Sequence, residues 1–143
     1  MAANRAVAKE ALAEAIKSTS SMGSSYDQSE TLIRLIDGGG LTESSADAFF
    51  QSASQISSSY DLSRVLRKVV DQPSVEERIL ERVLLTAIKI SSSHDRANLL
   101  EAIAGRHKLA GRSRQLYVDA TNAMGSHDGN RALAALVRAE ARQ

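Results

Sequence analysis

The segment ISSSYD at residues 56–61 returns almost unchanged as ISSSHD at residues 90–95. A small polar Ser/Gly turn followed by an aromatic residue and an aspartate also occurs at Tyr26 and at His127. The aromatic positions, at 26, 60, 94 and 127, thus recur with a period of about 34 residues. A fixed period in this range is the signature of a stack of similar units, and it restricts the fold more than any other feature of the chain.

Apolar residues recur at fixed distances from these four aromatic positions. They stand six and nine residues after each aromatic, and ten and eleven residues before it. The downstream positions are Leu32, Leu66, Leu100 and Leu133, then Leu35, Val69, Ile103 and Leu136; the upstream ones are Ile16 with Ala15, Phe50 with Phe49, Leu84 with Val83, and Tyr117 with Leu116.

Each unit contains the patterns of two helices. VEERILERVLLTAIKI at 75–90 and LSRVLRKVV at 62–70 place apolar residues with a period near 3.6, and no segment alternates with the period of a strand. We therefore predict an all-α chain with about eight helices, paired in four antiparallel hairpins. Such hairpins stack into an α-solenoid, here a single domain of 143 residues with units at 1–38, 39–72, 73–109 and 110–143.

The repeated turn is typical of a corner between two helices. Ser and Asp both prefer helix N-termini, where a side-chain oxygen accepts a backbone N–H, and the charge of Asp also suits the positive end of the helix dipole. Asp27 and Glu30 have the spacing of a capping box. The aromatic residue before each aspartate would then pack on the first turns as a hydrophobic staple, pairing Tyr60 with Val65 and His94 with Leu99.

ISSSYDLSRVL at 56–66 and ISSSHDRANLL at 90–100 resemble the short HEAT-like repeats of the form I-S-S-D-Y-D-x-x-x-V-L. Such repeats occur in bacterial proteins, often beside other domains, including membrane-anchored metallopeptidase-type regulators. The resemblance implies an α-solenoid interaction region and no catalytic residue. The chain departs from the pattern with His for Tyr in two units and Ser for the first Asp, and it shows no metallopeptidase motif.

Composition excludes several functions. The chain has no cysteine, so thiol catalysis, thiolate metal sites and disulfides are ruled out. No apolar run approaches the roughly 20 residues that span a bilayer, and the first residues lack the pattern of a signal or transit peptide. We expect a soluble protein and favour the cytoplasm. Met1 is compatible both with a complete chain and with a fragment of a larger bacterial regulatory protein.

No set of residues suggests catalysis or a cofactor. His94 and His127 could share a metal, but equivalent positions in stacked helices are about 8–10 Å apart, whereas zinc holds histidine nitrogens at about 2 Å. The serine runs lack a nucleophile motif and suit caps and turns. The DGGG segment at 37–40 lacks the Lys-Ser/Thr of a phosphate-binding loop. We predict neither enzymatic activity nor a bound cofactor or metal.

The function expected is that of a non-catalytic scaffold or adaptor that binds another protein. Its groove would be lined by the exposed faces of the second helices. The alternative is nucleic-acid binding by the second half, since residues 1–60 carry 4 basic and 7 acidic side chains and residues 61–143 carry 14 and 10. The RHKLAGRSR run at 106–114 also fits a solvated surface. Candidate partner-binding residues are Arg64, Arg67, Lys68, Arg96, Glu101, Arg106, Lys108, Arg112 and Arg114.

Overall fold

The computed structural model describes residues 14, 16, 18 and 23–143, and its regular structure there is entirely α-helical. The prediction of an all-α chain is confirmed for these residues. The first helix expected in residues 1–22 lies mostly outside them. The described helices are α2 (Ser25–Asp37), α3 (Ala46–Ala53), α4 (Ser59–Val70), α5 (Glu77–Ala87), α6 (Ser93–Arg106), α7 (Arg112–Asn122) and α8 (Ser126–Ala141).

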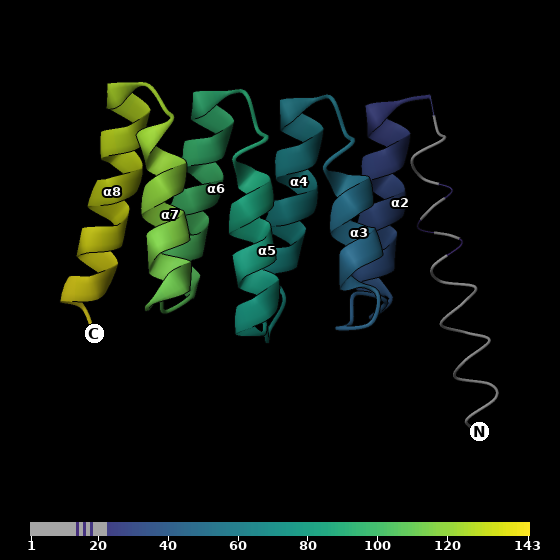
Figure 1. The fold of residues 1–143 in the computed structure, drawn as a ribbon, viewed down its shortest axis with the longest axis horizontal. Coiled ribbons are helices and arrows are strands. Elements are labelled where there is room, and N and C mark those ends of the chain that lie inside the picture. The colour runs from purple at the N-terminus through teal and green to yellow at the C-terminus, as the bar shows by residue number, and fades with distance from the viewer. Residues whose placement is uncertain (1–13, 15, 17, 19–22) are drawn as a thin grey trace.

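The helices form two rows (Figure 1). Along one row α2 contacts α4, α4 contacts α6 and α6 contacts α8, while in the other row α3 contacts α5 and α5 contacts α7. Contacts between the rows join α2 to α3, α4 to α5 and α7 to α8. The even-numbered helices all begin at the upper edge in Figure 1, and the links that follow α2, α4 and α6 lie at the lower edge.

The recurring apolar residues form the core between the rows. Leu32, Leu66 and Leu100 are fully buried, as the repeat predicts. Leu133, at the same position in α8, is only half-buried. Within its row α8 contacts α6 alone among the described helices, so one side of α8 is less covered.

The upstream positions are buried as well. Phe49 and Phe50 pack edge to face, with ring centroids 5.1 Å apart. Tyr117 is buried, and its hydroxyl donates a hydrogen bond of 2.7 Å to the carbonyl of Ala132. Burial raises the pKa of this phenol, which therefore stays neutral and ties α7 to α8.

The caps of α2, α4 and α6 are serines, not aspartates, whereas α8 follows Gly125, which makes no side-chain cap hydrogen bond. The prediction that Asp27 caps α2 is wrong because Asp27 lies inside the first turn, where its own N–H donates to a serine side chain. A serine hydroxyl three residues earlier reaches this N–H without distorting the turn. These bonds run from Asp27 to Ser24 (3.2 Å), from Asp61 to Ser58 (3.2 Å) and from Asp95 to Ser92 (3.1 Å).

The shifted cap also removes the predicted staples. Tyr60 is the second residue of α4, not the residue before a cap, and its side chain is 64 % exposed. His94 occupies the same place in α6 and is exposed too. The rings therefore face solvent at the start of each even-numbered helix, and the staple pairings with Val65 and Leu99 are wrong.

The other serines of the repeated turn link one corner to the next. The Ser25 hydroxyl lies 3.0 Å from the Ser57 hydroxyl, and Ser59 lies 2.8 Å from Ser91. The backbone N–H of Ser91 also donates to the Ser59 hydroxyl at 3.1 Å. In ISSSYD, the first serine thus binds the preceding corner, the second caps the helix and the third binds the following corner.

Candidate functional site

An exposed row of rings marks the starts of the even-numbered helices. Tyr26 is 58 % exposed and Tyr60 is 64 % exposed. His94 and His127 continue the row on α6 and α8, and both are exposed. His94 Nε2 lies 3.2 Å from the side-chain nitrogen of Asn98. In the part of the chain that the structure describes, no group of three or more His, Cys, Asp or Glu side chains could hold a metal ion.

Arg64 is held on the same face between α2 and α4. Its guanidinium pairs with Glu30 of α2 and, at 3.1 Å, with Asp61 of its own helix. Its central carbon lies 5.6 Å from the Tyr26 ring centroid and 6.0 Å from the Tyr60 ring centroid. The hydrogen bond to Glu30 is the main cause of the raised pKa of Arg64. This predicted partner-binding residue therefore lies against two exposed tyrosines.

Three further predicted basic residues pair with carboxylates at helix C-termini. Arg67 Nε lies 3.2 Å from Asp71 Oδ1, and Lys68 Nζ lies 3.1 Å from Asp37 Oδ1. Arg106 Nη1 lies 3.5 Å from the same Asp71 Oδ1. The Lys68 and Arg106 pairs join neighbouring even-numbered helices, so these cations stabilise contacts within the chain.

The remaining exposed candidates differ in their partners. Arg112 Nε approaches Glu81 Oε1 at 3.9 Å. Glu101 Oε1 lies 2.7 Å from Arg131 Nε on α8. Lys108 is exposed, and unlike the other exposed candidate cations it pairs with no carboxylate among the described residues.

Arg114 and Glu140 form a bidentate pair between α7 and α8. Arg114 Nε and Nη2 donate to the two carboxylate oxygens at 2.7 and 3.2 Å. These hydrogen bonds lower the pKa of Glu140 and raise that of Arg114. Both side chains reach solvent, so the pair positions the last helix without being buried.

Arg96 lies in the interior, and the prediction that it belongs to an exposed face is wrong. The residue is 7 % exposed. Its guanidinium donates to the carbonyls of Ile88 (2.8 Å), Ile90 (2.8 and 3.1 Å) and Ala120 (3.3 Å). Burial lowers its pKa. Arg96 joins the end of α5 to α7 and cannot meet a partner.

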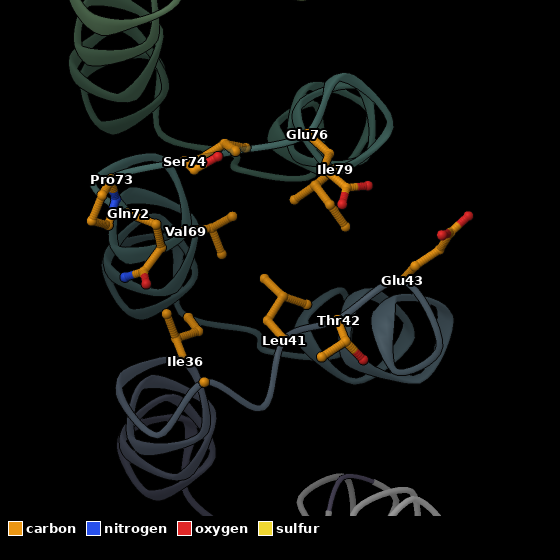
Figure 2. A pocket seen from close by; sticks show the side chains of 12 residues that line it. Ile36, Leu41, Thr42, Glu43, Val69, Gln72, Pro73, Ser74, Glu76 and Ile79 are labelled. Carbon is orange, nitrogen blue, oxygen red and sulfur yellow. The ribbon is translucent and has the colours of Figure 1, made fainter.

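A cavity of about 310 Å³, which sequence reasoning missed, opens between the links that follow α2 and α4 (Figure 2). We call it the lower-edge cavity. The side chains of Leu41, Val69 and Ile79 point into its centre (Figure 2). Its lining residues are Ile36, Gly39, Leu41, Thr42, Glu43, Val69, Gln72, Pro73, Ser74, Val75, Glu76 and Ile79.

Comparison with known proteins finds no family model, curated protein or solved structure that matches this chain. No helix in the described part of the chain is long and apolar enough to cross a membrane.

Proposed function

We propose that the chain is an α-solenoid of HEAT-like hairpins that acts as a non-catalytic scaffold or adaptor for another protein. Support for the architecture comes from the two rows, in which helices two apart in the sequence contact one another. Stacking of this kind produces extended surfaces, and repeat proteins use such surfaces to bind partners.

The pair of exposed tyrosines carries the proposal. Tyr26 and Tyr60 are large rings that face solvent on adjacent helices, with Arg64 held against both. Tyr and Arg are enriched among residues that dominate protein–protein binding energies. Because Glu30 and Asp61 already hold Arg64, ordering this surface on binding has a small entropic cost.

The test compares proteins captured by three forms of the chain. Tyr26→Ser/Tyr60→Ser removes both rings, and Leu85→Ser/Ile88→Ser is the matched control, because these residues are 41 % and 42 % exposed on the other row. A protein captured by the wild type and the control, but not by the tyrosine variant, supports the proposal. With that protein purified, the tyrosine variant should weaken binding about tenfold or more. Equal binding by all forms, or a turnover abolished by one side-chain change, refutes it.

Nucleic-acid binding is less well supported, because most of the basic residues that suggested it are paired within the chain. Arg64, Arg67, Lys68 and Arg106 each pair with a carboxylate. Such pairing reduces the charge available to phosphates. Binding to a mixed-sequence DNA duplex that falls steeply between low and high salt would favour this alternative.

A further inference from the structure

The lower-edge cavity has apolar walls that the surrounding helices position firmly. Ile36 at the end of α2 and Val69 at the end of α4 are buried in the core. Leu41 and Ile79 are half-buried and pack against that core from the opposite side. Walls attached to the core hold their shape, so the cavity is preformed.

The residue at one repeat position differs between the unit that borders the cavity and the unit that follows it. Gly39, Pro73 and His107 stand at the same repeat position in successive units. His107 reaches back to the preceding unit, where its Nε2 lies 2.9 Å from the carbonyl oxygen of Val70. Pro73 has no side chain that can make this contact with the unit before it. The junction between the α2 and α4 ends therefore lacks the side chain that His107 supplies at the next junction.

The charged residues that line the cavity are both acidic. Glu43 is exposed, and Arg78 Nη1 lies 3.1 Å from its carboxylate. Glu76 is exposed, makes no side-chain hydrogen bond to the start of α5, and pairs with no cation among the described residues. An apolar floor with carboxylates at its rim complements an aliphatic side chain next to a cation.

We propose that the lower-edge cavity receives an aliphatic side chain from a partner protein segment, with an adjacent lysine or arginine held by Glu76. The volume of about 310 Å³ is at the lower end of the range of about 300–1,000 Å³ for ligand pockets, enough for one such side chain. This inference rests on the proposed function and adds the chemistry of the segment bound. The links that line the cavity lie at the lower edge in Figure 1, whereas α4 begins at the upper edge with Tyr60 as its second residue, so the cavity is a second contact separate from the tyrosine pair.

The test uses three capped peptides that differ in one feature each: Gly-Lys-Leu-Lys-Gly, Gly-Lys-Ala-Lys-Gly and Gly-Glu-Leu-Glu-Gly. Each is titrated into ¹⁵N-labelled protein, and amide chemical shifts are followed. The Lys-Leu-Lys peptide should give saturating shifts around Leu41, Val75 and Ile79, with binding about tenfold tighter than that of the alanine peptide, because leucine buries more apolar surface. At low salt the Glu-Leu-Glu peptide should bind more weakly than either lysine peptide, because its carboxylates are repelled by those at the rim of the cavity.

A pair of neighbouring glutamates provides the matched variants. Glu76→Gln should weaken Lys-Leu-Lys binding about two- to fivefold, the range for an exposed charge pair. Glu77→Gln should leave binding unchanged, since Glu77 is also exposed but does not line the cavity. Both positions are solvent-exposed, so both variants should fold.

Equal binding of the leucine and alanine peptides, equal effects of the two glutamine variants, or shifts confined to other surfaces would overturn the inference. Capture of a protein through Tyr26 and Tyr60, without peptide binding at the cavity, overturns this inference and leaves the proposed function intact. Selective peptide binding at the cavity together with capture that does not depend on the tyrosines overturns the tyrosine surface alone.

Discussion

Replacing Arg96 by leucine should destabilise the protein although leucine fits the site. Leu62 occupies the equivalent position in the preceding unit and is buried, so the backbone there accepts a leucine. The substitution removes the guanidinium from the carbonyls of Ile90 and Ala120, which it contacts in the interior. Each orphaned carbonyl costs about 1–3 kcal/mol.

Part of that cost is recovered. Leucine avoids burying a charge that no carboxylate balances, and burying an aliphatic side chain is worth about 1.5–3 kcal/mol. Some of that gain is already present in the buried stem of Arg96. The net loss in the free energy of unfolding should be about 1–3 kcal/mol by these estimates.

Urea unfolding followed by circular dichroism measures this difference as a lower midpoint at unchanged slope. Arg106→Leu is the matched control, because Arg106 makes a half-exposed ion pair and should change stability by about 0.5 kcal/mol or less. Arg96→Lys should also destabilise, since one ammonium cannot reproduce the fork of donors. If Arg96→Leu is as stable as the wild type, the carbonyls do not need the guanidinium and the reasoning fails.

Three further outcomes can be measured on the same protein. Ser58→Ala should lower the free energy of unfolding by about 0.5–2 kcal/mol through loss of the α4 cap; an unchanged urea midpoint would contradict the assignment of the cap. Leu66→Ala should cost about 2–5 kcal/mol, because this fully buried residue leaves a cavity; a loss no greater than that of Ser58→Ala would contradict its core role. The pKa of Glu140 is lowered in the folded chain, so its contribution to stability is present above its ordinary pKa and is lost as pH falls through the folded value. Carboxyl NMR titration should show that pKa rising in Arg114→Ala, and no change would exclude the pair in solution.

The repeat predicts most of the helical pattern because the spacing of apolar residues, which determines which helix face is buried, can be read directly from the sequence. Leu66 and Leu100 recur at the same distance from the turn, and both are buried. The capping residue was harder to predict because Ser and Asp both favour helix N-termini. Only the backbone shows that Ser58 accepts the N–H of Asp61.

The candidate site was less predictable. Whether a side chain is exposed depends on which way it points around its helix and on contacts with residues distant in the sequence. The charge of Arg96 predicts a surface position, whereas its alignment with Leu62 indicates the interior. The pairing of Arg64 with Glu30 joins two separate units, so it becomes visible only when neighbouring units are placed side by side. The cavity is lined by Pro73, which stands where the next unit has His107, but the sequence alone does not show that His107 contacts the preceding unit.

The ion pairs between neighbouring even-numbered helices have a consequence for the order of the units. Exposed pairs add little to stability, but charges can discriminate strongly between right and wrong neighbours. If residues 39–72 were deleted, Glu30 would face Asn98, the residue that aligns with Arg64 in the next unit, and its cation would be lost. Arg106 would lose Asp71 but would face Asp37, the aspartate at the same repeat position. Units with similar cores are therefore not interchangeable: a chain shortened by this unit would keep its packing residues, but Glu30 would no longer face a cation.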